Sequence, residues 1–274
     1  MAVRLTVALA FNLDARSRVR RKWETDVWRS KARRWLGVAA FLILSPLVAT
    51  SADWADWQAR LEYAYHTEDL KAVEALRSET QTRPDGQAAQ RTYAQALGAF
   101  RAGLLLYDVG QSQAADSALR TCLKLLSEPA DLDAQPIEGI VLAIACEGRS
   151  GQWNSPSVAR RLAQAQQINP HHPQLLLVKA WRLSAARGAP SLLQARQAQR
   201  EAWHQAAVAF LRPDATPVGS PSWGGAEAWL GLAQAEDSLG HGLLARESYE
   251  QALVLAPDFK AARSGLSSLR DRLP

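Results

Sequence analysis

The chain has 274 residues, of which 47% are hydrophobic and 22% are charged, and this balance is typical of a folded globular protein and excludes a disordered chain. Its two cysteines exclude both a scaffold built on disulfides and a zinc site of four thiolates. The formal charge is +5, but residues 1–35 hold ten basic and three acidic side chains and so carry +7, which leaves −2 on the remainder. The folded part therefore offers no basic excess, and we expect no nucleic-acid partner.

The first 52 residues have the pattern of an export signal. Residues 36–50 are uncharged and mostly apolar, a basic stretch precedes them, and small residues follow before the acids return. This order is typical of a secretory signal peptide, with Ala52 or Ser51 as the last residue removed. An uncleaved membrane anchor is the alternative interpretation, although fifteen residues are short for a span, and a cytosolic chain is the third. We therefore predict a leader or anchor with a basic preamble over residues 1–52, and a periplasmic or inner-membrane-anchored protein.

From residue 53 onward the apolar residues follow a helical period. Trp54, Trp57, Leu61 and Tyr65 recur every three to four residues and so form one stripe on a helix. No segment alternates between apolar and polar residues with a period of two, which a half-buried strand would require. The sequence predicts one all-α domain over residues 53–274.

Residues 226–258 contain a repeat-like unit. Eight residues carry its pattern: Trp229, Leu232, Ala233, Gly240, Ala245, Tyr249, Ala252 and Pro257. The first three share a helix face, Gly240 ends that helix, and Pro257 ends the helix that follows. These spacings resemble the tetratricopeptide repeat (TPR). The resemblance implies antiparallel helix pairs that stack into a right-handed superhelix.

The spacing of residues from the turn glycine to the final proline, which we call the ladder, also fits three earlier segments. They are Trp153, Val158, Leu162, Ala165 and Pro170; Gly110, Ala115, Leu119 and Cys122; and Thr67, Ala72, Leu76 and Pro84. The successive starting residues lie 43, 43 and 87 residues apart, which leaves room for one degenerate unit at about residues 174–211. A spacing near 43 exceeds the roughly 34 residues of the family, so we expect lengthened first helices. The whole chain also resembles small exported bacterial proteins built of such units.

Residues 212–225 are predicted to form a loop, because three prolines and three glycines in fourteen residues exclude a regular helix. We expect Trp223 in this loop to pack on a neighbouring helix.

Motifs of catalysis are absent from the sequence. It has no glycine-rich phosphate loop, no nucleophile elbow and no zinc-binding helix motif. We interpret the adjacent His171 and His172 as solvated turn residues rather than metal ligands, and the helical carboxylates as a solvated face. The sequence thus predicts no enzyme, no cofactor and no metal. The alternative, an envelope enzyme that uses carboxylates, predicts a cleft where two acids converge.

Cys122 and Cys146 occupy slots that lie close together in a stacked array, one on the second helix of a unit and the other on the first helix of the next. Export into an oxidising compartment would favour a disulfide between them. The alternative is a pair of buried thiols.

The TPR resemblance implies a concave face that binds extended peptides. On this face we predict four contact residues: Tyr107, Glu147, Gln234 and Asp237. The predicted function is a non-enzymatic periplasmic or envelope-tethered scaffold that binds another envelope protein or peptide, and that meets the membrane only through an uncleaved N-terminal segment. The alternative is a small-molecule-binding accessory subunit of an envelope transport system.

Overall fold

The computed structural model describes residues 46–82, 88–127, 136–185, 192–212 and 223–272. The chain divides into two compact units, Met1–Ala49 and Thr50–Pro274, and nearly all of the described residues belong to the second unit. The predicted leader, apart from its last seven residues, lies outside the described residues. Among the helices that are described, none is long and apolar enough to cross a membrane.

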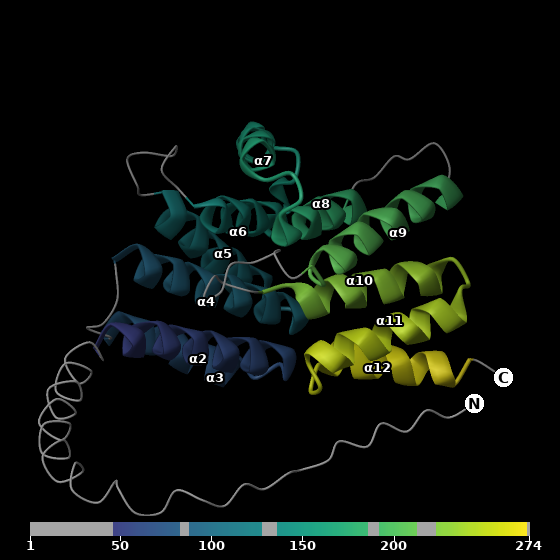
Figure 1. The fold of residues 1–274 in the computed structure, drawn as a ribbon, viewed down its shortest axis with the longest axis horizontal. Coiled ribbons are helices and arrows are strands. Elements are labelled where there is room, and N and C mark those ends of the chain that lie inside the picture. Colours follow the sequence, from purple (N-terminus) through teal and green to yellow (C-terminus); the bar gives the residue numbers. More distant parts are fainter. Residues whose placement is uncertain (1–45, 83–87, 128–135, 186–191, 213–222, 273–274) are drawn as a thin grey trace, which may run out of the picture. The chain divides into compact units, whose positions relative to one another are not determined.

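Every regular element in the described ranges is a helix, which confirms the all-α prediction (Figure 1). In chain order they are α2 (Pro46–His66), α3 (Leu70–Thr82), α4 (Ala88–Asp108), α5 (Ser112–Ser127), α6 (Ile137–Glu147), the π-helix η2 (Gly148–Gln152), α7 (Pro156–Ile168), α8 (Pro173–Ala185), α9 (Leu192–Ala209), α10 (Gly225–Ser238), α11 (Gly242–Leu255) and α12 (Lys260–Arg270).

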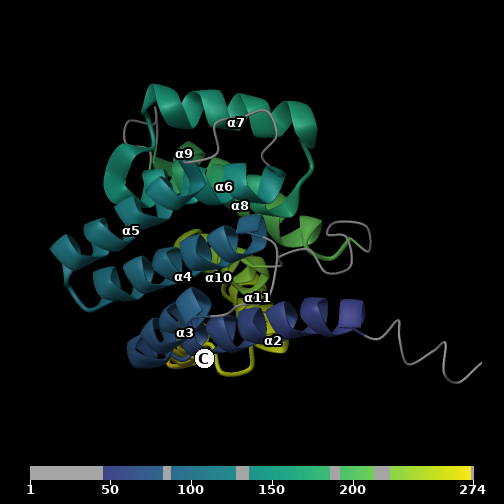
Figure 2. The ribbon, with the colours of Figure 1, turned by 90° about the vertical axis from the view of Figure 1, so that its left-hand side faces the viewer.

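Helices that follow one another pack as pairs, most extensively α4 with α5, α8 with α9 and α10 with α11. The pair α8 and α9 coincides with the degenerate unit expected near residues 174–211. Within the second compact unit, Thr50–Pro274, the chain rises from α2 and α3 through α4 and α5 to α8, then returns through α9 and α10 to α12 (Figures 1 and 2).

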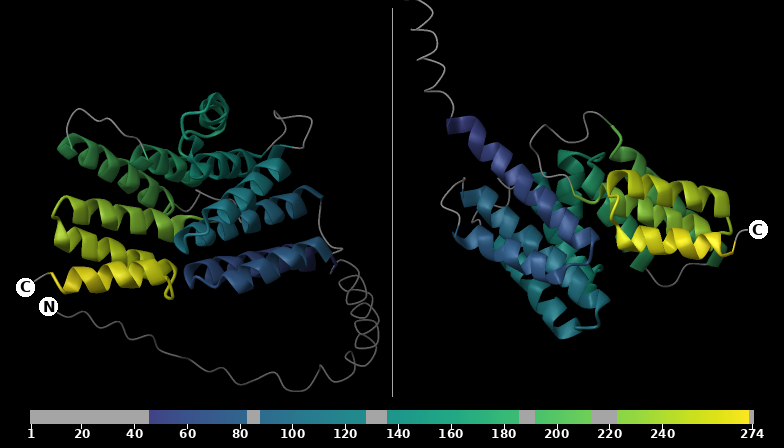
Figure 3. Two further views of the ribbon diagram at one scale, coloured as in Figure 1. Left: turned by 180° about the vertical axis from the view of Figure 1, so that it is seen from behind. Right: turned by 90° about the horizontal axis from the view of Figure 1, so that it is seen from below.

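The first and last helices of the second unit therefore meet (Figure 3). The rings of His66, at the end of α2, and Phe259, just before α12, lie 4.5 Å apart between centroids. The ammonium of Lys260 also lies 3.8 Å from a carboxylate oxygen of Glu68.

The turns after α4 and α10 have the same construction. Gly110 and Gly240 adopt φ values of +77° and +80°, a left-handed conformation that a side chain would disfavour. The next residues, Gln111 and His241, donate their backbone N–H groups five residues back, which satisfies carbonyls at the helix ends. Glycine at these two ladder positions thus ends the first helix of each pair.

The ladder prolines Pro170 and Pro257 are exposed, whereas the ladder positions between turn and proline are buried in α5, α7 and α11. In three second helices these residues are Ala115, Leu119 and Cys122; Val158, Leu162 and Ala165; and Ala245, Tyr249 and Ala252. Most belong to one large apolar core around α4, α6 and α8, whereas α10, α11 and α12 enclose a smaller second core. The spacing in the sequence therefore correctly identified the buried stripe of each second helix.

The helix α2 begins at Pro46, seven residues before the helical pattern was expected to start. Proline is well suited to the first position of a helix, since its missing N–H would have no partner there.

Candidate functional site

A cavity of about 930 Å³ lies between α2, the start of α4, the N-terminus of α10 and the turn after α11. Its walls are mainly apolar and aromatic, and they include Trp54, Tyr63, Tyr93 and Phe210. Such walls are typical of sites that bind ligands through apolar contact and a few polar groups.

A second cavity of about 570 Å³ lies between α2 and α3. The two cavities adjoin, because Ala59 and Tyr63 of α2 line both of them. Tyr63 is 60% exposed at this junction although it is a large aromatic residue. We call the two cavities together the α2 groove.

One wall of the larger cavity contains a buried ion network that joins α2, α4 and α10. The side chain of Arg101 is fully buried. Its Nε donates to Glu62 Oε1 at 2.9 Å, and its Nη2 donates to the other oxygen of the same carboxylate. Its Nη1 lies 2.5 Å from Glu227 Oε1. The guanidinium also stacks over the ring of Tyr65, 3.9 Å from the ring centre.

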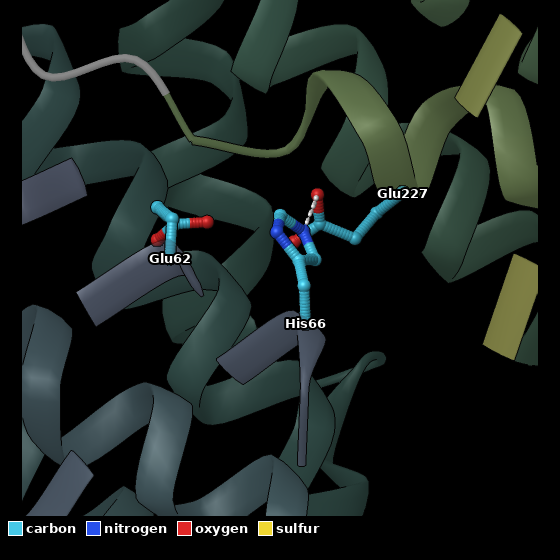
Figure 4. Close-up of side chains that lie close together, drawn as sticks. All are labelled: Glu62, His66 and Glu227. Carbon is cyan, nitrogen blue, oxygen red and sulfur yellow. Dashed lines mark ion pairs between the residues drawn. The ribbon is translucent and has the colours of Figure 1, made fainter. Parts of the chain in front are cut away.

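His66 completes the cluster from one helical turn beyond Glu62. Its Nε2 lies 3.6 Å from Glu227 Oε2, across the gap between α2 and α10 (Figure 4). The spacing of four residues places Glu62 and His66 on the same face of α2. Glu227 lies in the first turn of α10, where the helix dipole favours a negative charge.

Burial and charge act against each other in this network. Burial raises the pKa of Glu227, but the charge of Arg101 and the contact with His66 outweigh it and lower the pKa to about 2. Burial also raises the pKa of Glu62, and here it outweighs the opposing charge of Arg101. Burial lowers the pKa of Arg101, but the two carboxylates outweigh it and raise the pKa well above its usual value. Glu227 and Arg101 are therefore both charged at neutral pH.

The donor atoms of Glu62, His66 and Glu227 all lie within 4.8 Å of one another, which is the arrangement of a small metal site. Arg101 opposes this assignment. Its guanidinium already donates hydrogen bonds to both oxygens of Glu62 and forms an ion pair with one oxygen of Glu227, and it brings a positive charge that would repel a divalent ion. The residues thus fit a closed ion network better than a metal centre.

Glu62 and Glu227 are also two acids that converge at a cavity, the feature expected of an enzyme that uses carboxylates. General acid or base catalysis needs a group that can exchange a proton near neutral pH. Glu227, with a pKa of about 2, holds no proton there, and Glu62 is bonded through both oxygens to Arg101. The two acids therefore cannot both exchange a proton near neutral pH, because Glu227 stays ionised there.

The four predicted contact residues lie outside both cavities: Tyr107, Glu147, Gln234 and Asp237. Glu147 is buried and accepts a hydrogen bond from Arg161 at 2.5 Å, whereas Gln234 is exposed. Asp237 forms an ion pair of 2.7 Å with Arg272. None of the four residues therefore belongs to the α2 groove.

The structure joins Cys122 of α5 to Cys146 of α6 by a disulfide, with Cα atoms 6.3 Å apart. Trp223 packs as predicted, because it is buried and stacks on Trp181 with ring centres 6.1 Å apart. Its Nε1 also donates to the hydroxyl of Tyr93 at 2.9 Å.

The prediction that His172 is a solvated turn residue is wrong. This residue is only 3% exposed, whereas its neighbour His171 is exposed as predicted. The burial of His172 lowers the pKa of its imidazole.

Sequence reasoning missed the ion network. The signal that could have revealed it is Arg101 itself, the one charge within the apolar stretch of residues 96–107 in α4. A lone charge on a helix buried on all sides needs partners of opposite charge.

No protein-family model and no curated protein matches this chain.

Proposed function

We propose that the chain is a non-enzymatic, TPR-like helical-repeat scaffold of the bacterial envelope, periplasmic or tethered there, and that it binds an extended segment of another protein in the α2 groove. The observation that carries the proposal is the pair of adjoining cavities along α2. They are apolar, partly aromatic and bordered by the exposed Tyr63.

The TPR-like part of the proposal is supported by the helix pairs. The pairs α4–α5 and α10–α11 share a left-handed glycine at the turn and a buried small residue five positions later. These are the features that the resemblance implied. The envelope location is supported by the basic and apolar pattern of residues 1–52 and by a disulfide, which an oxidising compartment would preserve.

The shape of the groove favours an extended segment over a compact ligand. A compact ligand would fill one cavity and leave the other empty, whereas an extended chain can pass over Ala59 and Tyr63 and place side chains in both. Gln58, which lines the larger cavity, has a buried amide nitrogen with no hydrogen-bond acceptor among the described residues. A backbone carbonyl of the bound segment would satisfy this donor.

A groove-blocking variant tests the proposal. Ala59 is exposed and borders both cavities, so Ala59→Arg should obstruct the path between them. Ala114 is another exposed alanine, on α5 outside the groove, and Ala114→Arg is the matched control. Tagged wild-type protein and the control should retain a stoichiometric partner from envelope extract that Ala59→Arg loses. A partner retained equally by all three proteins would contradict binding in the groove.

The second candidate is a small-molecule-binding subunit, and the larger cavity favours it, since about 930 Å³ falls within the range of roughly 300–1,000 Å³ for ligand sites. Ala75→Arg separates the two candidates, because the exposed Ala75 lines the smaller cavity alone. An extended segment would be displaced by this substitution, whereas a small molecule in the larger cavity would still raise the melting temperature.

A further inference from the structure

Four carboxyl side chains line the larger cavity. They belong to Glu62, Glu138, Glu227 and Asp258, and the described residues of the lining include no lysine or arginine. A cavity whose charges share one sign favours ligands of the opposite sign.

The nearby cations neutralise only part of this charge. Arg101 is shared by Glu62 and Glu227, so two carboxylates face one guanidinium. Asp258 has its own partner, Arg263, at 2.6 Å.

Glu138 is the lining carboxylate that has no ion-pair partner among the described residues. It is half-buried in the first turn of α6, close to the positive end of that helix's dipole. A helix N-terminus supplies about half a positive charge and so offsets only part of a carboxylate. An excess of negative charge therefore remains in the cavity, and Glu138 is its most available carrier.

Aromatic rings lie in the same cavity. Tyr63, Tyr93 and Phe210 keep part of their surface exposed while lining it. Rings of this kind attract a cation over their faces and also cover the apolar stem of a long basic side chain.

We infer that the larger cavity receives a lysine or arginine side chain of the bound segment, with its charged end paired to Glu138 and its stem against the aromatic rings. This inference rests on the proposed function and deepens it, because it gives the partner segment a chemical signature. A segment with an acidic residue at that position would be repelled.

Matched peptide pools test the inference on the full-length protein. Three pools carry lysine, norleucine or glutamate at a fixed central position, with randomised neutral residues on both sides. Binding is followed by tryptophan fluorescence, since Trp54, Trp57 and Trp223 line the cavity. We expect the lysine pool to bind about three- to tenfold more tightly than the norleucine pool, the range of a partly exposed charged contact.

Two substitutions locate the effect. Glu138→Gln should remove most of the preference for lysine and leave the norleucine pool unaffected. Glu247→Gln makes the same chemical change at an exposed residue of α11 outside the groove, and it should leave the preference intact.

The outcomes separate this inference from the proposed function. Equal binding of all three pools would overturn the inference while leaving peptide binding in place. A preference for lysine that persists in Glu138→Gln would also overturn it. Failure of every pool to bind would count against both.

Discussion

Replacement of Arg101 by methionine should destabilise the protein strongly. Methionine keeps the length of the side chain but leaves Glu62 and Glu227 without the cation that bonds to both. Removal of one partner from a buried ion pair costs about 3–5 kcal/mol, because the remaining charge stays buried without compensation. For a unit of this size each kcal/mol lowers the melting temperature by about 2–4 °C, so we expect a fall of roughly 10 °C.

Urea unfolding at pH 7, followed by tryptophan fluorescence, measures this loss. The control is Arg246→Met, which breaks an exposed pair with Glu250 on α11 and should cost less than about 1 kcal/mol. Adding Glu62→Gln and Glu227→Gln to Arg101→Met should recover part of the stability, since no buried charge then remains. A loss in Arg101→Met no larger than in the control would refute the view that the network joins the three helices.

Three further predictions concern pH, packing and the disulfide. The pKa of Glu227 is lowered from 4.5 to about 2, so its stabilisation exists above pH 5 and is lost as the pH falls towards 2; Glu227→Gln should therefore lose less stability between pH 5 and pH 3 than the wild type, as measured by urea midpoints. Gly231→Ala should cost about 1–3 kcal/mol because its Cβ would overlap the ring of Trp203, whereas Gly139→Ala, which meets no atom, should be neutral or slightly stabilising in thermal melts. Cys122→Ala opens a disulfide that closes a chain segment of 24 residues, and calorimetry should show a loss of about 3 kcal/mol.

Local spacing explains what the sequence could predict. A tight reversal between paired helices favours glycine, and the contact between the two helices favours small or apolar residues. Both features depend only on residues close together in the sequence of one helix pair. Gly240, Ala245 and Tyr249 therefore carry their structural roles in their spacing. The packing of Trp223 was predictable for a similar reason, because a large aromatic residue in a polar loop gains most by burial.

The ion network and the groove depend on contacts that spacing does not encode. Glu62 and Arg101 are separated by 39 residues, and Glu227 reaches them only because the chain returns after α8. No residue spacing within a single helix pair encodes this return. The four contacts predicted for the concave face, Tyr107, Glu147, Gln234 and Asp237, do not line the α2 groove.

Photo-crosslinking from position 63 in living cells tests groove binding most directly. A benzophenone amino acid replaces Tyr63, which is 60% exposed at the junction of the two cavities, and in a second strain replaces Leu243, which is 76% exposed on α11. We predict a discrete adduct from position 63 alone, mapped by mass spectrometry to one extended segment with a lysine or arginine. Identical adducts from both positions, or none from position 63, would contradict a binding groove along α2.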